Sequence, residues 1–448
     1  MSKIETETQW LRSTILPDIL KNGRLVDNYS DSKANTFRVG DIEIDVIGHT
    51  EAFMLTFCYR TTITLNTTVK SSNEKWSLST QVTELLQCKT PMMPPKVYES
   101  IQFGALFSNE INFYTVILPE IQKLAGGKFA APKYYYSELN PYSAVAILEN
   151  FAEQGWRVTK DRVGLSLEHA LIAVDYLGQF HGFAYAMKHT NPELFAKLTH
   201  GLKESRYASD VIHPEWELTM KTSIKRAAKA VATFQPQIDE EFVKNLCFLI
   251  TDYNLYGRQR VAPREPLATL CHGDYVRNNV AYRYNDKEVP QEIMMFDYQT
   301  LRVSSPMIDL AVFLAVSIYA DVRYPNFDAI FDKYCTALYD SYRSHAKVEV
   351  PKDISRAELL KEYVRFLPYS VSISCSFLMT LVEPLDMSPE EMFAKKTSNE
   401  ELIERTMKQG GEVVDKEVAH QVQEMLELSQ LTGVSIDDGI DVDKLAKV

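Results

Sequence analysis

The sequence lacks the basic excess that nucleic-acid-binding proteins carry. Its 448 residues include 48 basic and 60 acidic side chains, which gives a net charge of −12. Nucleic acids and anionic membranes both prefer basic surfaces. We therefore expect neither as a partner. A nucleotide is not excluded, because its site needs only local positive charge and a metal.

Cysteine is scarce and its spacing indicates no special site. The six cysteines are far apart and form no CxxC pair: Cys58, Cys88, Cys247, Cys271, Cys335 and Cys375. This pattern favours reduced, mostly buried thiols over a disulfide framework or a zinc site. The first nine residues are polar and acidic, unlike a secretory signal. We therefore expect a cytoplasmic protein.

Long apolar runs are also missing. The longest, residues 366–382, contains Pro368 and four serines. It is shorter than the about 20 residues that a membrane span needs. A buried helix explains it better, and we find no internal repeat or low-complexity tract.

What is present changes in character along the chain. Residues 37–89 are rich in β-branched and aromatic side chains, which predicts strands, and residues 143–148 predict a buried strand. Residues 103–124 predict a helix that ends at Ala125-Gly126-Gly127. From residue 167 onward most segments have helical spacing. The pattern predicts an α+β protein with a small β-rich lobe at 1–148 and a larger, mostly helical lobe at 149–448, which would hold a catalytic loop at 271–299 and a helical tail.

The strongest local motif is the run 271–279, where Asp274 follows His272-Gly273 and Asn279 lies five residues later. Phosphoryl transfer to an alcohol needs a carboxylate that accepts the hydroxyl proton and oxygen ligands that hold magnesium. Asp274 and Asn279 have the spacing of a kinase catalytic loop, in which the Asp is the base and the Asn binds metal. The alternative is a loop whose Asp and Asn cap a helix.

Two further acidic residues follow in order. Residues 279–284 and 293–296 predict a β-hairpin, and Asp297 ends its second strand as a magnesium-binding aspartate would. The alternative for Asp297 is a carboxylate in a turn. Asp309 lies in an apolar run and would need a partner if buried. We interpret it as an acceptor that holds the catalytic-loop backbone, with capping of a helix as the alternative.

These segments resemble the ecdysteroid kinase-like family of insects, within the wider choline-kinase-like and aminoglycoside-phosphotransferase-like group. The resemblance spans residues 44–342 and the opening helix at Trp10-Leu11. It implies a bilobal protein-kinase-like fold and the cofactors ATP and Mg²⁺. The matches are His272-Gly273-Asp274 with Asn279, Asp297-Tyr298-Gln299, Asp309-Leu310-Ala311, residues 107–114, residues 148–151 followed by Gly155, Phe180-His181-Gly182, and residues 191–195.

The resemblance also implies a nucleotide site in the front lobe. Lys89 matches the lysine that grips the phosphates, and Glu110 matches the glutamate that fixes this lysine. Lys96 is a nearby competitor for the lysine role. Glu149 and Phe151 would form the hinge that meets the adenine. One departure from other kinases is the loop at residues 48–53, because Gly48 is its only glycine and the cover over the phosphates is thin.

The spacing after Asp297 indicates the size of the acceptor. Only eleven residues separate it from Asp309, too few for the activation segment of a protein kinase. The spacing therefore predicts a small-molecule kinase. The resemblance implies that it phosphorylates a hydroxyl of an ecdysteroid or a xenobiotic alcohol, as in steroid hormone metabolism or detoxification. The rival hypothesis is a pseudokinase, which binds a small molecule or a protein without transferring phosphate.

Overall fold

The computed structural model describes residues 5, 9–21, 37–47, 56–70, 77–91, 99, 102–140, 143–208, 212–385 and 397–445. Contacts divide the chain into two compact units. The sheet unit comprises Met1–Glu99 and Ala131–Gly155, and the helical unit comprises Ser100–Ala130 and Trp156–Val448. The fold is α+β and kinase-like, as predicted. The lobe boundary at residues 148 and 149 stays a prediction.

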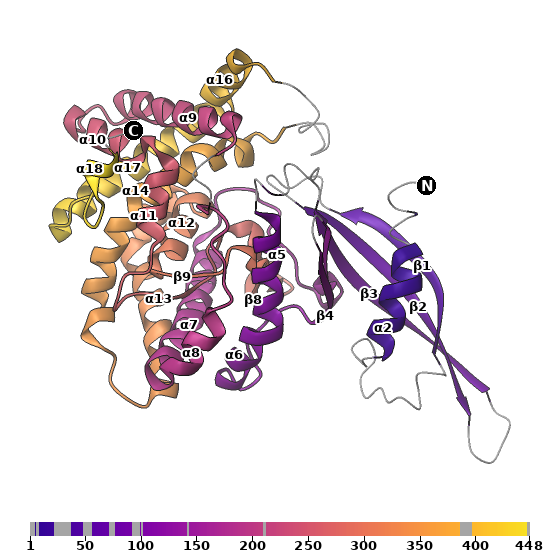
Figure 1. Ribbon diagram of the computed structural model, residues 1–448. Helices are drawn as coiled ribbons and strands as arrows, with labels where there is room; N and C mark the ends of the chain where they lie inside the picture. The colour runs from indigo at the N-terminus through magenta and orange to yellow at the C-terminus, as the bar shows by residue number, and fades with distance from the viewer. Residues whose placement is uncertain are drawn as a thin grey trace. The chain divides into compact units, whose positions relative to one another are not determined.

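The sheet unit is built on one antiparallel sheet with the strand order β1-β2-β3-β5-β4 (Figure 1). The first three strands are rich in Thr, Val and Ile, which suit a pleated surface. The predicted strands are therefore confirmed, and residues 144–148 of β5 are buried as expected. The elements are η1 (Leu11–Ile15), α2 (Leu16–Lys21), β1 (Phe37–Ile47), β2 (Thr56–Lys70), β3 (Ser77–Pro91), β4 (Tyr134–Asn140), β5 (Ser143–Glu149) and η3 (Phe151–Gln154).

The first helical segment of the helical unit runs through α5 (Phe103–Asn112), η2 (Phe113–Ile117) and α6 (Leu118–Leu124). It ends where the sequence predicted, at Gly126 and Gly127, both of which have positive φ. We expected this segment in the front lobe, but its contacts group it with the helical unit. The carboxylate of Glu110 therefore belongs to the same compact unit as the catalytic loop.

Two glycines bring the helices α7 (Leu167–Thr190) and α13 (Ala320–Ala346) close together. A Cβ on Gly178 would overlap the carbonyl oxygen of Tyr334, and one on Gly182 would overlap that of Leu338. The two glycines lie four residues apart and so share one face of α7. Their close approach to α13 places His181, which lies between them, against the hydroxyl of Tyr334 at 2.8 Å.

The core of the helical unit contains α12 (Met307–Ser317), in which every residue is buried, and α14 (Arg356–Val382). By length and composition α14 could cross a membrane, with a mean hydropathy of 1.3, but 83% of its most apolar window is buried inside the protein. The predicted buried helix at 366–382 is thus confirmed. The remaining helices are α8 (Pro192–Thr199), α9 (Pro214–Phe234), α10 (Glu240–Thr251), α11 (Tyr253–Val261), η6 (Lys352–Ile354), α16 (Asn399–Lys408), α17 (Gly411–Thr432) and α18 (Val442–Leu445).

The tail helix α17 packs on its own unit. Val418, Val422 and Met425 are buried and recur at the spacing of one helix face. A buried ion-pair network fixes the helix further, because Arg323 of α13 contacts Glu417 at 2.9 Å and Glu424 at 2.8 Å. The tail is therefore an integral part of the helical unit.

Candidate functional site

The catalytic-loop motif connects two short strand pairs. β6 (Thr269–Cys271) pairs with β9 (Arg302–Ser304), and β7 (Val280–Tyr284) pairs with β8 (Pro290–Met295) as the predicted hairpin. The loop itself includes η4 (Arg277–Asn279). Gly273 has φ +82°, and a Cβ there would overlap the carbonyl oxygen of Thr300. Only glycine fits this turn, which lets the loop lie against the chain that follows β8.

Asp309 holds the backbone of this loop. Its Oδ2 accepts from the backbone N–H of His272 and its Oδ1 from that of Gly273, both at 2.7 Å. His181 Nε2 lies 3.2 Å from the same Oδ2, and the Asp309 side chain is fully buried. No side chain caps α12, so the structure favours the loop-holding interpretation over helix capping.

The predicted base and its neighbour are in direct contact. Asn279 Nδ2 donates to the backbone oxygen of Asp274 at 2.8 Å and to its Oδ2 at 3.2 Å. The other carboxylate oxygen of Asp274, Oδ1, accepts from the guanidinium of Arg206 at 3.2 Å. Because Nδ2 is used in this way, the Oδ1 of Asn279 is the atom that can ligate a cation.

Asp297 lies next to Asn279 across the open end of the hairpin. The backbone N–H of Phe296 donates to the oxygen of Asn279 at 3.0 Å, and His272 Nε2 lies 3.0 Å from the oxygen of Phe296. Asp297 has φ +67°, a left-handed conformation that is uncommon outside glycine but more accessible to Asp than to most residues. Amide and carboxylate oxygens, which Asn279 and Asp297 carry, are ligands that a hard cation such as Mg²⁺ prefers. Their role as metal ligands stays a prediction.

The residues after Asp297 connect it to α5. The Tyr298 ring stacks on Phe113 with 3.4 Å between centroids, and its hydroxyl donates to Met295 O at 3.1 Å. Burial raises the pKa of this hydroxyl well above its ordinary value, so it remains a donor. Gln299 Nε2 donates to Glu110 at 3.2 Å, and Asn109 Nδ2 donates to the oxygen of Gln299 at 3.1 Å. The buried hydroxyl of Tyr298 therefore has a hydrogen-bond acceptor.

The predicted nucleotide residues belong to different parts of the structure. Glu110 is fully buried in the helical unit. In the sheet unit, Lys89 lies on β3 opposite Ala146 of β5, although its side chain is outside the described part. Glu149 ends β5 and accepts from the N–H of Lys133 at 3.3 Å, and Phe151 begins η3. The pairing of Lys89 with Glu110 and the hinge role of Glu149 and Phe151 stay predictions. Gly48 and Lys96 lie outside the described residues.

A second cluster of possible metal ligands has a different explanation. His181, Cys271 and Asp309 place their side-chain ligand atoms within 4.8 Å of one another, and all three are buried. The thiol of Cys271 donates to backbone oxygens, and both oxygens of Asp309 already accept hydrogen bonds. These three residues are therefore explained by the hydrogen bonds that hold the backbone of the catalytic loop. Cys271 is one of four described cysteines that are free thiols, with Cys247, Cys335 and Cys375.

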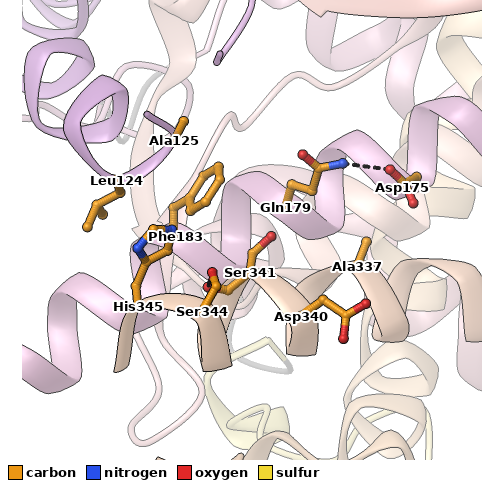
Figure 2. A pocket seen from close by; sticks show the side chains of 10 residues that line it. All are labelled: Leu124, Ala125, Asp175, Gln179, Phe183, Ala337, Asp340, Ser341, Ser344 and His345. Atoms are coloured by element: carbon orange, nitrogen blue, oxygen red, sulfur yellow. Dashed lines mark hydrogen bonds between the residues drawn. The ribbon is translucent and has the colours of Figure 1, made fainter. Parts of the chain in front are cut away.

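A separate hollow of about 300 Å³ lies between α6, α7 and α13 (Figure 2). Asp175, Phe183 and His345 are among its lining residues, and none of the predicted site residues is. Asp175 is paired with Lys333 at 2.8 Å and accepts from Gln179 at 2.6 Å. Its charge is thus already compensated, and the hollow adds nothing to the candidate site.

Arg206 is the site residue that the sequence did not reveal. It lies in the connection after α8, in a segment with no recognised motif, 68 residues before the carboxylate it contacts. Asn109 and Gln299 did stand within matched segments, but no role was predicted for them. The charges near Arg206 in the sequence do not indicate that this residue contacts the catalytic loop.

Comparison with protein families finds one match, the ecdysteroid kinase-like family, over residues 50–346. No curated protein matches the chain. Similar solved structures include a spectinomycin phosphotransferase in complex with ADP and spectinomycin, at 12% identity and a TM-score of 0.43, with 86% of this chain and 94% of that chain covered. Another is a microcompartment-associated aminopropanol kinase, at 11% identity and a TM-score of 0.35, covering 94% and 99%. Both TM-scores lie below 0.5, so this likeness carries no information on what the chain binds.

Proposed function

The chain belongs to the ecdysteroid kinase-like family, and on this premise we propose that it is a small-molecule kinase. It transfers the γ-phosphoryl group of ATP to a hydroxyl of a lipophilic acceptor, an ecdysteroid or a xenobiotic alcohol. In this reaction the hydroxyl oxygen forms a bond to phosphorus, the bond from phosphorus to the β-phosphate oxygen breaks, and ADP leaves. Asp274 takes the proton of the hydroxyl.

The observation that carries this proposal is the way in which Asp274 is held. Both of its carboxylate oxygens accept hydrogen bonds, from Asn279 and Arg206, and the backbone before it is bound to a buried aspartate. When the base is already held in one orientation, less entropy is lost on reaching the transition state. A displacement of a catalytic group by about 1 Å can lower the rate 100-fold. This support is consistent with a catalytic role for Asp274.

The cofactor residues follow from the same reasoning. Asn279 and Asp297 supply the oxygens that would hold magnesium, whose contribution when bound is to neutralise charge on the phosphates. Lys89, held by Glu110, is proposed to grip the phosphates, and the backbone at Glu149 and Phe151 to meet the adenine. A location in the cytoplasm remains a prediction.

The acceptor is proposed to be small because no platform for a peptide is formed after Asp297. The eleven residues before Asp309 are taken up by η5 (Tyr298–Thr300), β9 and the first turn of α12. All of these residues are described, and no activation segment occurs among them. The aromatic content of 11% is sufficient for an apolar acceptor pocket.

The proposal is tested by a transfer assay with γ-labelled ATP and Mg²⁺ against ecdysteroids and a panel of other alcohols. We expect labelled product from the wild type and none from Asp274→Asn. We also expect Asp297→Ala to lose metal-dependent turnover while it keeps its fold, and unchanged turnover would contradict the metal assignment. A wild type that transfers no phosphate, and that ATP with Mg²⁺ does not stabilise against heat, would instead be a pseudokinase.

A further inference from the structure

We propose that Arg206 is a positioning residue for the catalytic carboxylate, an inference that rests on the proposed function. Its guanidinium lies 3.2 Å from Oδ1 of Asp274, and the two side chains are only 18% and 26% exposed. Partial burial makes such a pair stronger than one on the open surface, where salt bridges contribute little. The contact is made on the oxygen that Asn279 does not hold.

The segment that carries Arg206 is attached to the catalytic strands. Glu204 accepts from the backbone N–H of Arg206 at 2.8 Å through one oxygen, and from Arg302 at 3.0 Å through the other. Arg302 lies opposite Cys271 in the β6–β9 pair, and Cys271 comes three residues before Asp274. The carboxylate of Glu204 therefore fixes the backbone of Arg206 relative to the strand that leads to the base.

A second attachment joins the same segment to α5. Asn109 exchanges two hydrogen bonds with the backbone of Lys203, accepting from its N–H at 2.9 Å and donating to its oxygen at 2.8 Å. Asn109 is fully buried and also holds Gln299. The start of the Arg206 segment is thus held by the residue that connects α5 to the chain after Asp297.

The far side of Arg206 rests on a chain of buried tyrosine hydroxyls. Its guanidinium donates to the hydroxyl of Tyr369 at 3.5 Å, and the Tyr207 hydroxyl is hydrogen bonded to those of Tyr369 at 3.0 Å and Tyr253 at 3.2 Å. A Cβ on Gly257 of α11 would overlap the ring of Tyr207, so this glycine makes the approach possible. A planar guanidinium held on two sides loses little further freedom when it contacts a carboxylate.

The loop itself supplies no cation at this place. The loop has two basic residues. The Nε2 of His272 is hydrogen bonded to the backbone oxygen of Phe296, and Arg277 is fully buried. Val276, two residues after the base, is apolar. Arg206 therefore provides the charge that holds Oδ1 of Asp274 while Asn279 holds Oδ2, which leaves the carboxylate one orientation towards the acceptor hydroxyl.

The test compares Arg206→Met, Arg206→Lys and a matched control, Arg365→Met. The Arg365 side chain is 12% exposed and pairs with Asp438 at 2.6 Å, so its removal breaks a partly buried ion pair to which Asp274 does not belong. Turnover of MgATP is measured with ecdysone and, separately, with water as the acceptor. We expect Arg206→Met to lower kcat about 100-fold with KM for ATP nearly unchanged, as loss of orientation predicts. Arg206→Lys should recover part of kcat, and Arg365→Met should have the kcat of the wild type.

Each outcome leads to a decision. A wild type that turns over while Arg206→Met keeps the same kcat would overturn this inference and leave the proposed function intact. A wild type without any turnover would overturn both. Thermal melting shows which variants fold. If Arg206→Met does not fold, kcat of Arg206→Lys and of Tyr369→Phe is compared with the wild type instead. A lower kcat at constant KM in those two supports the inference, and wild-type kcat in both overturns it.

Discussion

Removal of the Asp309 carboxylate should have a large effect on both stability and activity. Asp309 is 1% exposed, and its side chain accepts two backbone N–H groups of the catalytic loop at 2.7 Å. In Asp309→Ala these two donors lose their acceptor in a buried environment. Ser317 of α12 would still accept the backbone N–H of Arg277 at 3.0 Å, but the backbone at His272 and Gly273 would be free to shift.

The size of the effect follows from the two hydrogen bonds. A bond to a charged group contributes about 1.5–3 kcal/mol, and a buried donor left without an acceptor costs about 1–3 kcal/mol. We therefore expect Asp309→Ala to lower the free energy of unfolding by about 3–5 kcal/mol, a large share of the about 5–15 kcal/mol of a typical domain. Asp309→Asn should also be destabilising, because its amide has one acceptor oxygen and its NH2 group would face the second backbone N–H.

The assay is urea denaturation followed by fluorescence and circular dichroism, with kcat measured on the same samples. Coincident transitions by both probes are required, because the chain has two compact units. The matched control is Asp321→Ala, which removes an exposed aspartate from the first turn of α13 and should cost less than about 1 kcal/mol. If Asp309→Ala unfolds at the urea midpoint of this control, Asp309 does not hold the loop and the interpretation is wrong.

Three other changes have defined outcomes. Gly273→Ala should lower the free energy of unfolding by more than about 2 kcal/mol and remove most of kcat, because a Cβ there would both strain a left-handed backbone and overlap the oxygen of Thr300. Gly126 also has positive φ, but open space surrounds its Cβ position. Gly126→Ala should therefore lower the free energy of unfolding by only about 1 kcal/mol. Burial raises the pKa of the Cys335 thiol to about 12, so with rising pH this thiol ionises in the unfolded chain before it does in the folded protein. The free energy of unfolding should therefore fall as pH rises from about 9 towards 12. Cys335→Ala should reduce this dependence of the denaturation midpoint on pH. Arg323→Met leaves Glu424 buried without its partner and should cost about 3–5 kcal/mol, with earlier proteolysis of α17 but an unchanged KM for ATP.

Much of this site could be predicted because its residues lie in short, ordered segments. Asp274, which we propose as the base, Asn279 and Asp297 have fixed spacings, so the proximity of their backbones follows from local chain geometry. The structure brings Asp274, Asn279 and Asp297 together through the hairpin register and the hydrogen bond between Phe296 and Asn279. The role of Asp309 was also recognised, since a carboxylate in an apolar run needs a partner.

The remaining contacts could not be predicted because they join distant segments. Arg206 reaches Asp274 only through a loop whose path depends on Glu204 and Asn109. Side-chain periodicity describes one element at a time and gives no information on such a path. The same limit applies to α5, whose own sequence does not show which unit its contacts favour.

The attachment of α5 restricts how such an enzyme could be controlled. In protein kinases, the position of the corresponding helix is one of the features that activation controls. Here Asn109 and Glu110 are bonded to Gln299 and Asn109 to Lys203, while Phe113 stacks on Tyr298. An outward swing would break all of these buried contacts together. We therefore expect this helix to stay in place relative to the catalytic loop, and control by its movement to be unfavourable.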